Sequence, residues 1–462
     1  MHAFLELLRR LLPKGVLDSY HRFLARIAAV LYGHPSQKLI VIGVTGTNGK
    51  STTSYLLAKA LEAGGAKTGC TTTALFKVGN HEWVNDTKMT MPGRFRLQKL
   101  LRRMVSEGCR YAVVETSSQG ILQHRHREIA YDACVFTNLT PEHIEAHGSF
   151  EAYKRAKKKL FCHTASLPPK FFEGEAIPHI EVLNKNDAHA EDFVVPGFDR
   201  VVWYGTVKGA DVAASDIIER EDGVSFTVGE VPFTVHIPGR VMVENALAAV
   251  ATAEALGIPR ERISERLASV PGMPGRVERV DEGQPFRVIV DYAYEPAALE
   301  KLFDYADRIR GGGRIIHVTG SAGGGRDTAR RVRIGELSAR RADITIVTNE
   351  DPYDEDPQAI IDQVAEGGII AGAKEGISLF RIPDRMNAIR KAVGIALPGD
   401  TVLLTGKGNE PVMAVAHGKK IPWDDREAAR KALQELAHTA ISAEDAGGKH
   451  REPAPDGPSA LQ

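Results

Sequence analysis

The segment Gly43–Thr52, which reads GVTGTNGKST, combines residue types that bind phosphate. An apolar stretch, LIVIG (39–43), runs into it, and a helical pattern follows. Backbone N–H groups of such a glycine-rich loop, together with a helix N-terminus, form a cradle for anions. Lys50 is expected to reach the β- and γ-phosphates of a nucleotide, and Ser51 to help hold Mg²⁺. The segment therefore predicts a nucleotide site made by Gly46, Thr47, Asn48, Gly49, Lys50, Ser51 and Thr52.

A second candidate for metal chemistry is Glu115, which ends the apolar stretch YAVVE (111–115). A carboxylate at the end of a strand next to a phosphate loop can contact the magnesium ion of the nucleotide. A strand-end glutamate on its own is more often a capping or salt-bridging residue. Its combination with the glycine loop favours the metal site.

The elements that must position these residues follow a repeating pattern. Short apolar strands at 39–43, 111–115 and 133–138 are separated by amphipathic helical segments, which is typical of a mostly parallel, doubly wound sheet. Residues 201–237 alternate instead and predict a β-rich insertion. A second α/β series begins near Met273, with strands in FRVIVDYA, RIIHVTG, DITIVTNED and TVLLTGKG. Each strand ends in a polar or Gly-rich loop, at the edge where open α/β sheets bind ligands.

This pattern divides the chain into an N-terminal helical segment (1–36), a central nucleotide-binding domain (37–272), a C-terminal α/β domain (273–437) and a disordered tail (438–462). The N-terminal segment is apolar at helical spacing, with Pro13 and Gly15 separating two pieces and a cationic polar side. We expect these helices to pack on the following domain. Peripheral contact with a membrane surface is the less favoured interpretation.

Composition excludes several classes of protein. The 462 residues have a formal net charge of zero, so no global positive field points to a nucleic-acid partner. Four cysteines without CxxC spacing argue against a zinc ribbon and fit a reducing cytosol. No apolar run is long enough for a membrane helix, and no signal peptide is recognisable. A cytoplasmic location is expected.

Ten ordered segments between about residues 39 and 436 resemble the Mur ligase family, most closely its UDP-N-acetylmuramyl-tripeptide synthetase branch. They are GVTGTNGKST, ETSSQ, FTNLTPEH with AHG following, AYKRAKKKLF, ENALAA, MPGRVE, DYAYEP, the GGRD of GSAGGGRD, TNEDPYDEDP and GKGNE. The resemblance implies a P-loop central domain followed by a Rossmann-like α/β domain. It also implies an ATP-dependent ligase that passes the γ-phosphoryl group to a carboxylate, after which an amine attacks the acyl-phosphate.

The resemblance also implies roles for individual residues. Lys157 stands where the family carries a lysine carbamylated by CO₂, and His143 where it carries another ligand of a second Mg²⁺. Lys50, Lys157 and His143 are thereby the expected catalytic residues, and two magnesium ions are the expected cofactors. The metal ligands are expected to be Ser51, Glu115, His143 and Lys157. The residues expected around the nucleotide further along the chain are Asn245, Arg276, Asp291 and Tyr294.

Other matching segments fall where relatives bind the acceptor and the incoming amino acid. The substrate residues implied are Thr72, Thr90, Arg94, Arg326, Asp327, Asp351 and Glu410. The partners implied are a UDP-muramyl-peptide or similar carboxylate acceptor and a free amino acid.

Several positions depart from the family pattern. Only about 38 residues precede the first strand, whereas relatives have an N-terminal uridine-binding domain, which this sequence is expected to lack. Tyr353 stands where diaminopimelate-adding relatives carry an arginine, and a tyrosine cannot form a bidentate ion pair with a carboxylate. The sequence therefore leaves the added amino acid and the oligomeric state open. It also leaves open a folate-like or lipid-linked acceptor, and a non-catalytic nucleotide-binding partner protein.

Overall fold

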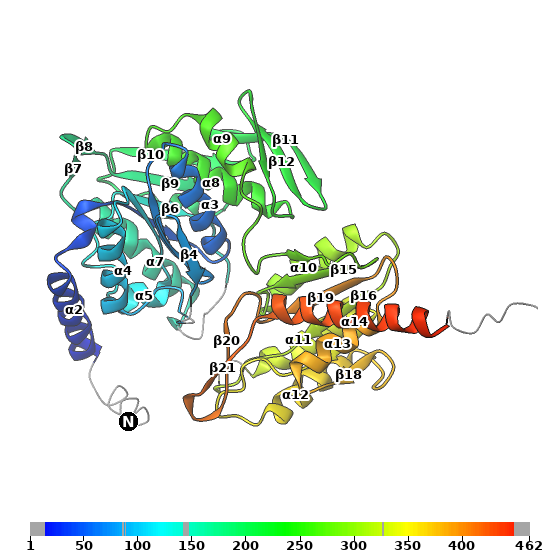
Figure 1. Cartoon of the computed structure of the whole chain (residues 1–462). Coiled ribbons are helices and arrows are strands. Elements are labelled where there is room, and N and C mark those ends of the chain that lie inside the picture. The colour runs from blue at the N-terminus through cyan, green and yellow to red at the C-terminus, as the bar shows by residue number, and fades with distance from the viewer. Residues whose placement is uncertain (1–13, 86, 88, 142–146, 326–327, 448–462) are drawn as a thin grey trace, which may run out of the picture. The chain divides into compact units, whose positions relative to one another are not determined.

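The computed structural model describes residues 14–85, 87, 89–141, 147–325 and 328–447. The chain divides into two compact units, Met1–Pro274 (unit 1) and Gly275–Gln462 (unit 2). Each unit is built around its own sheet with helices on both faces (Figure 1).

Unit 1 contains a sheet with the strand order β13-β12-β11-β10-β9-β6-β1-β5-β2-β3-β4. Its centre is parallel: β1 (Ile40–Thr45) lies between β5 (Tyr111–Glu115) and β6 (Ala133–Phe136), and β9 (Ile180–Asn184) lies beyond β6. Every residue of these four strands is buried, which explains why they read as continuous apolar stretches. The register places Glu115 beside Val44, immediately before the glycine loop.

The edges of the sheet in unit 1 are antiparallel hairpins. One is β3 (Leu75–Val78) with β4 (His81–Val84), beyond β2 (Thr68–Thr71). At the other edge, β12 (Gly223–Val228) is antiparallel to both β11 (Val212–Arg220) and β13 (Val231–Val235), whereas β10 (Arg200–Gly205) lies parallel to both β11 and β9. The β-rich prediction for residues 201–237 is confirmed, but β10 pairs with β9, so these strands continue the main sheet and do not form a separate insertion.

Helices cover both faces of this sheet. The first core contains residues of α3 (Lys50–Glu62), α8 (Val241–Ala255) and α9 (Arg260–Ala268). The second contains residues of α4 (Arg94–Ser106), α5 (Ser118–Leu122) and α7 (Phe150–Ala165). The small side chains of its alanines allow α8 to approach α3 closely. Nearly every residue of α8 from Val243 to Ala253 is buried.

Unit 2 has a sheet with the order β14-β15-β19-β16-β17-β18. The strands β15 (Arg287–Asp291), β16 (Ile315–Thr319), β17 (Ile344–Val347) and β19 (Thr401–Thr405) confirm the four predicted for the second series. They are parallel to β18 (Leu379–Arg381), and β14 (Glu278–Val280) is antiparallel at one edge.

The helices of unit 2 again occupy both faces of the sheet. One core contains residues of α10 (Pro296–Ile309), α11 (Ala329–Arg341) and α12 (Pro357–Ile370), and the other contains residues of α13 (Arg385–Ile395) and α14 (Asp425–Gly447). The short hairpin of β20 (Val412–Ala414) and β21 (Lys420–Pro422) follows β19.

The structure corrects the expectations for the two ends of the chain. Helix α2 (Lys14–Leu31) includes Gly15, so Gly15 does not break the helix as predicted. Helix α14 continues to Gly447, whereas composition predicts a disordered tail from residue 438. The alanines in LAHTAISAEDA have high helix propensity, and they extend a helix whose first turns are held by packing. Among the described residues, no helix is both long and apolar enough to cross a bilayer.

One buried carboxyl group should make unit 1 sensitive to pH. Glu181 on β9 is fully buried, and its neighbours in the sheet are Cys134 of β6 and Val201 of β10. Burial raises the pKa of Glu181 to about 8, although the backbone of Val195 and the charge of Lys158 oppose the rise. The folded protein therefore keeps this carboxyl group protonated at pH values where the unfolded chain has lost the proton.

This difference fixes the sign of a pH effect on stability. Because the folded-state pKa is raised, the contribution of Glu181 to the unfolding free energy falls as pH rises from about 4.5 through about 8. We expect Glu181→Gln to raise the unfolding free energy by roughly 2 kcal/mol at pH 9 relative to the parent, with little difference at pH 4.5. Urea denaturation across this pH range measures the difference. The matched control is Glu191→Gln on the exposed surface, and an equal pH profile for both variants would contradict the assignment.

Candidate active site

The glycine loop lies between β1 and α3, as the sequence predicts. Gly49 precedes α3 with φ 78°, a left-handed conformation that glycine adopts without strain. The first backbone hydrogen bond of the helix goes from Thr53 N to Gly49 O at 2.8 Å. The N–H groups of Lys50, Ser51 and Thr52 therefore lie in the first turn, ahead of the first backbone hydrogen bond of the helix. They form the part of the loop that is suited to phosphate.

The loop is held from the side by the residues that follow β6. The backbone N–H of Thr47 donates to Asn138 O at 2.8 Å, and that of Asn48 donates to the Asn138 side-chain oxygen at 2.8 Å. In return, the Asn138 side-chain nitrogen donates to Asn48 O at 3.0 Å, and Thr137 Oγ1 donates to the same oxygen at 2.7 Å. Thr47 and Asn48 thus lie in the loop as predicted, but their N–H groups are committed to Asn138. The anion cradle is left to the first turn of α3.

Two glycines of the loop occupy positions where a side chain would collide with a neighbour. A Cβ on Gly46 would lie 1.9 Å from Thr137 Oγ1, and a Cβ on Gly49 would lie 2.3 Å from the Asn245 side-chain oxygen. Asn245, on α8, is buried and also accepts a hydrogen bond from Thr53 Oγ1 at 3.3 Å. The structure therefore brings Asn245 to the loop, although nearly two hundred residues separate them along the chain.

Two lysines also contact the loop. Lys50 Nζ donates to Thr47 O at 2.7 Å, so its side chain folds over the loop that precedes it. Lys157 Nζ, on α7, donates to Gly46 O at 2.5 Å and lies 4.3 Å from the ring centroid of Tyr153. Tyr153 in turn donates its hydroxyl to Thr47 Oγ1 at 3.3 Å. Lys157 is only 1% exposed, so α7 places a buried amine directly beside the phosphate loop.

Glu115 is the second buried charge at this place. Ser51 Oγ donates to Glu115 Oε2 at 2.8 Å, which joins the first turn of α3 to the end of β5. Thr73 donates to the same carboxylate from its backbone N–H at 2.7 Å and from its hydroxyl to Oε1 at 3.1 Å. The Thr73 hydroxyl also contacts Thr90 Oγ1 at 3.0 Å. A chain of oxygen atoms therefore connects the loop with the segment around Thr90.

These oxygen atoms fit a magnesium ion. Mg²⁺ prefers carboxylate and hydroxyl oxygens and keeps several of its ligands as phosphate or water. Ser51 Oγ and Glu115 are buried and adjacent, and they offer this donor set next to the anion cradle. Within the described ranges, no group of three or more His, Cys, Asp or Glu side chains is arranged to hold a metal alone. His143, the predicted ligand of a second ion, lies outside the described residues.

The other residues predicted to bind substrate in unit 1 differ in their surroundings. The hydroxyl of Thr72 is buried and closes a turn with Leu75, accepting from its N–H and donating to its carbonyl, both at 2.8 Å. Arg94 begins α4 and donates to Gln123 O at 2.6 Å. Arg125 lies nearby, and burial together with the charge of Arg94 lowers its pKa to about 10. Both guanidinium groups are half-buried, and Arg125 donates to the Gln123 side-chain oxygen and to Met91 O.

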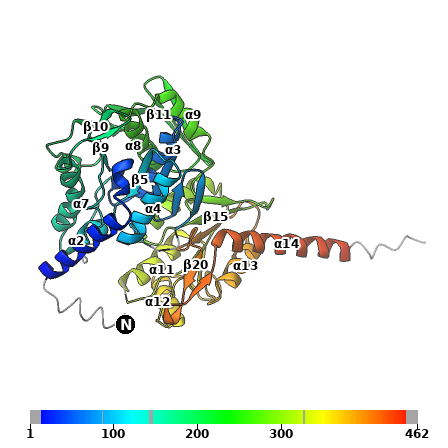
Figure 2. The ribbon, with the colours of Figure 1, turned by 60° about the vertical axis from the view of Figure 1, so that its left-hand side comes forward.

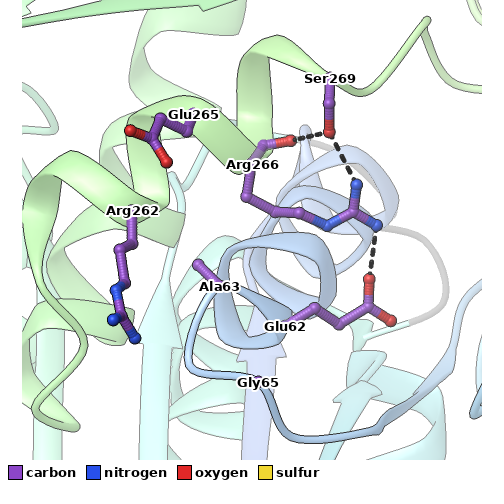
Figure 3. A pocket seen from close by; sticks show the side chains of 7 residues that line it. All are labelled: Glu62, Ala63, Gly65, Arg262, Glu265, Arg266 and Ser269. Carbon is purple, nitrogen blue, oxygen red and sulfur yellow. Dashed lines mark hydrogen bonds and ion pairs between the residues drawn. The ribbon is translucent and has the colours of Figure 1, made fainter.

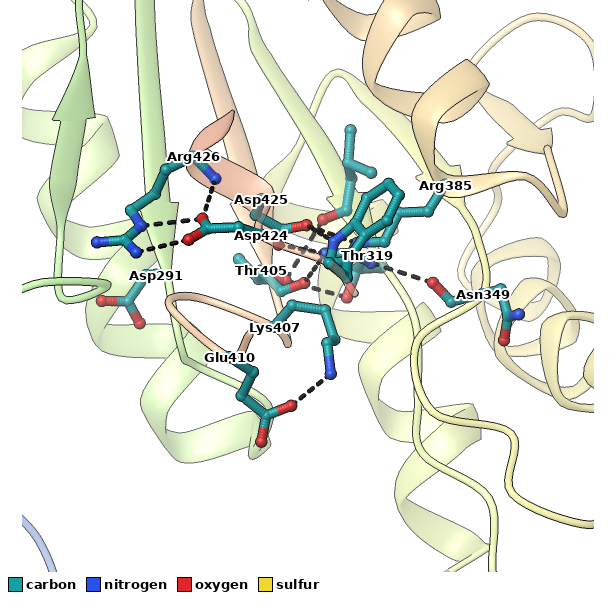
Figure 4. A network of polar contacts seen from close by, with 12 residues as sticks. Asp291, Thr319, Asn349, Arg385, Thr405, Lys407, Glu410, Asp424, Asp425 and Arg426 are labelled. Carbon is teal, nitrogen blue, oxygen red and sulfur yellow. Dashed lines mark hydrogen bonds and ion pairs between the residues drawn. The ribbon is translucent and has the colours of Figure 1, made fainter. Parts of the chain in front are cut away.

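Two of the residues predicted for unit 2, Asp291 and Glu410, lie at and beyond the carboxyl ends of β15 and β19 (Figure 4). Lys407, fully buried after β19, donates to both oxygens of Asp351 at 3.1 and 3.0 Å and also pairs with Glu410. Glu410 additionally accepts from the Tyr292 hydroxyl at 3.2 Å. Asp351 and Glu410 therefore lie on the two sides of one lysine.

Unit 2 also contains a fully buried ion pair. Arg385 and Asp425 are both fully buried and are joined by two hydrogen bonds of 2.8 and 2.6 Å. Arg385 also donates to Thr405 O at 2.7 Å, which fixes the end of β19. Glu350 is buried as well, and burial raises its pKa to about 7, with Arg385 opposing and Asp351 adding to the rise.

The residues predicted around the nucleotide in unit 2 are adjacent to one another. Asp291 is buried and accepts from the N–H groups of Val277 and Ala293 at 2.8 and 2.7 Å. Burial raises its pKa, and the charge of Arg276 opposes the rise. Arg276 Cζ lies 5.2 Å from the ring centroid of Tyr292, and the ring centroids of Tyr292 and Tyr294 are 5.3 Å apart. The predicted substrate residues Arg326 and Asp327 lie outside the described residues.

A separate hollow of about 420 Å³ between α3 and α9 does not belong to this site (Figure 3). It lies by Glu62, at the opposite end of α3 from the loop. Its Arg266 is occupied by Glu62 at 2.7 Å and by the Ser269 hydroxyl at 2.8 Å.

Comparison with protein families gives two adjoining matches. The Mur ligase middle domain matches residues 44–253, and the Mur ligase glutamate ligase domain matches residues 275–408. The chain belongs to the Mur ligase family. Mur ligases are ATP-dependent enzymes that form amide bonds and use Mg²⁺, which agrees with the loop and with the oxygen ligands beside it.

Individual relatives agree with this assignment. The chain is 43% identical over 428 residues to a UDP-N-acetylmuramyl-tripeptide synthetase of Roseiflexus sp. strain RS-1, covering 90% of this chain and 82% of the relative. It is 36% identical to the UDP-N-acetylmuramoyl-L-alanyl-D-glutamate–2,6-diaminopimelate ligase of Geobacillus kaustophilus, covering 92% and 84%. A solved structure of a diaminopimelate ligase of this kind superposes with a TM-score of 0.58 at 28% identity, covering 87% of this chain and 79% of that one.

Sequence reasoning missed several residues of this Mur ligase site. Asn138 and Thr137 hold the loop, Thr73 and not Thr72 contacts Glu115, and Lys407 lies between the two acids of unit 2. Their signals were present in the motifs FTNLTPEH, TTT and GKGNE. The motifs mark the segments, but only the fold shows which side chain of each segment turns toward the loop or the cluster.

The contacts of Asn138 predict that it positions the ATP loop. We expect Asn138→Ala to weaken Mg-ATP binding by about tenfold, because it leaves the N–H and carbonyl of Asn48 without their partner. Asn138→Asp keeps an acceptor for the N–H but loses the donor, so an intermediate affinity is expected. Titration calorimetry measures both. Asn186→Ala, which removes a comparable loop contact to Thr206, serves as the control. Parent-like affinity of Asn138→Ala would contradict a positioning role.

Proposed function

We propose that this chain adds an amino acid to the peptide carboxylate of a UDP-N-acetylmuramyl-peptide, in the synthesis of peptidoglycan precursors. The observation that carries the proposal is the convergence of the ATP loop, Glu115 and Lys157 at one place in unit 1. The acceptor is inferred from relatives that are similar to this chain over more than four-fifths of their own length.

The residues of unit 1 are suited to transfer of the γ-phosphoryl group to a carboxylate. The first turn of α3 binds the phosphates through its N–H groups, and Lys50 exchanges its contact with Thr47 O for a phosphate oxygen. Both reactants are anionic, so positive charge and fixed donors at this place lower the cost of bringing them together. The acyl-phosphate then formed is open to attack by the amine of the incoming amino acid.

Ser51 and Glu115 are proposed to hold one Mg²⁺, and His143 with a carbamylated Lys157 a second one. When bound, the ions offset the negative charge that accumulates between the phosphate and the acceptor. Carbamylation requires the ammonium of Lys157 to lose one proton first; the neutral Nζ then bonds to the carbon of CO₂ and loses a second proton, which gives an anionic ligand. The closeness of Lys157 to Gly46 supports this role, because the modified side chain would lie at the loop.

The acceptor and the amino acid are proposed to bind through different sets of residues. Arg94, with Arg125 beside it, provides the seat for an acceptor anion, and Thr90 continues the chain of hydroxyl groups from Glu115. Asp351 and Glu410, with Arg326 and Asp327, are proposed to recognise the incoming amino acid. Asn245, Arg276, Asp291 and Tyr294 are proposed to surround the nucleotide.

The substrate proposal is tested by supplying UDP-muramyl-L-alanyl-D-glutamate, ATP and Mg²⁺ with each candidate amino acid. We expect one amino acid to stimulate phosphate release together with a product of the corresponding mass. Lys50→Ala serves as the inactive control and should lower turnover at least about a hundredfold. Absence of stimulation with every UDP-muramyl acceptor would overturn the proposed acceptor while leaving the family assignment intact.

A second prediction concerns the carbamate. Lys157→Ala should lose at least about a hundredfold in turnover, because the site lacks one anionic metal ligand. Added formate or acetate should restore part of the activity by supplying a carboxylate in the space of the missing side chain. Lys157→Arg fills that space with a permanent cation, so it should remain inactive with either acid. Full activity of Lys157→Ala without added acid would disprove the role.

A further inference from the structure

Helix α2 carries a row of large apolar side chains that face solvent. Its inner side packs on unit 1 through buried Ala25, Ala28 and Ala29, and α2 contacts α4 (Figures 1 and 2). The outer side exposes Val16, Tyr20, Phe23, Ile27, Val30 and Leu31. The exposed fraction is 63% for Phe23 and 66% for Leu31, which is high for large apolar residues. The helix is therefore anchored to the protein, and among the described residues its outer apolar face is exposed.

These side chains form one surface and are not scattered. Their spacing of three or four residues places them along one stripe of the helix. Phe23, Ile27, Val30 and Leu31 line a hollow of about 410 Å³ together with Arg26. Contiguous apolar surface of this kind in a folded protein usually marks an interaction site.

The charges around the stripe indicate what it binds. Arg22 and Arg26 are exposed on α2, and Lys99 and Arg102 are exposed on the neighbouring α4, whose Arg96 and Arg103 lie over the rings of Phe76 and Trp83. Asp18 is the only acidic residue in the sequences of these two helices. It is half-buried and lies 3.4 Å from His124 Nε2. An apolar stripe bordered by cations is typical of helices that lie on an anionic bilayer.

A second copy of the chain is a poorer match for this surface. Pairing two copies through α2 would bring two sets of these arginines and lysines together, which is unfavourable because like charges repel. A bilayer offers acyl chains for Phe23 and Ile27 and anionic headgroups for the arginines, whose long stems can reach the interface.

We propose that α2 is a membrane-surface helix, which binds anionic lipid through Tyr20, Phe23, Ile27, Val30 and Leu31 with Arg22 and Arg26 at the headgroups. Binding is peripheral, since the stripe covers one side of a helix whose other side stays packed on unit 1. The ligase would thereby be held at the membrane while its ATP loop remains in the aqueous phase.

The test is flotation of the full chain with vesicles of phosphatidylcholine alone or of equal parts phosphatidylcholine and phosphatidylglycerol. We expect binding to the anionic vesicles that weakens in high salt. Phe23→Ser with Ile27→Ser should weaken it at least about tenfold, and Arg22→Gln with Arg26→Gln by about fivefold per charge. The control pair is Ile370→Ser with Ile377→Ser, two exposed isoleucines of unit 2, which should bind as the parent does.

Three results would overturn the proposal. The first is that the parent binds neither kind of vesicle, and the second is that the Phe23→Ser/Ile27→Ser variant binds as tightly as the parent. The third is that light scattering shows a dimer of the parent, which the same variant converts to a monomer, while neither protein binds vesicles. The variants lie away from the ATP loop, so phosphate release in vesicle-free buffer should stay unchanged and report that they fold. Because flotation does not use the ligase reaction, failure of the lipid proposal and failure of the substrate proposal are distinguishable.

Discussion

The clamp that Thr137 and Asn138 place on the glycine loop is the interaction on which the ATP site depends. The carbonyl groups of a loop that binds phosphate through its N–H groups need other hydrogen-bond donors, because a buried backbone group without a partner lowers the stability of the fold. Here the carbonyls of Gly46, Thr47 and Asn48 accept from Lys157, Lys50, Thr137 and Asn138. These side chains hold the carbonyls from the sides of the loop, so they do not cross the N-terminus of α3.

This arrangement accounts for the small residues around the loop. Thr137 lies against Gly46 and Asn245 lies against Gly49, so neither position has space for a Cβ. Separate contacts join α7 and α8 to the same segment of chain, so that Glu115, Lys157 and Asn245 all lie beside the loop or the first turn of α3. The arrangement of these residues in unit 1 is therefore a consequence of how its parallel strands are ordered, with β1 between β5 and β6.

Unit 2 differs from unit 1 in that several charged side chains are buried near one another. Arg385 and Asp425 form a pair with two hydrogen bonds, and Lys407 is bonded to Asp351, Glu410 and the carbonyl of Val412. Buried charges persist only when partners of this quality replace water. Glu350 differs, since its Oε2 has no hydrogen-bond partner among the described residues and burial raises the pKa of this carboxyl group to about 7.

The amino-acid sequence by itself determined the phosphate loop, the doubly wound sheets, the four strands of the second series and the family. These features depend on local order: glycines before a helix, apolar runs of strand length, and motifs in a set succession. Tertiary structure alone decided that Thr73 contacts Glu115, that Asn138 occupies the N–H groups of Thr47 and Asn48, and that Lys407 lies between Asp351 and Glu410. It also decided that α2 buries its alanines and leaves Phe23 exposed, although the helical pattern is apolar on both sides. The physical reason is that spacing along the chain reports which residues share a face, whereas hydrogen-bond partners and burial depend on segments that only the folded sheet brings together.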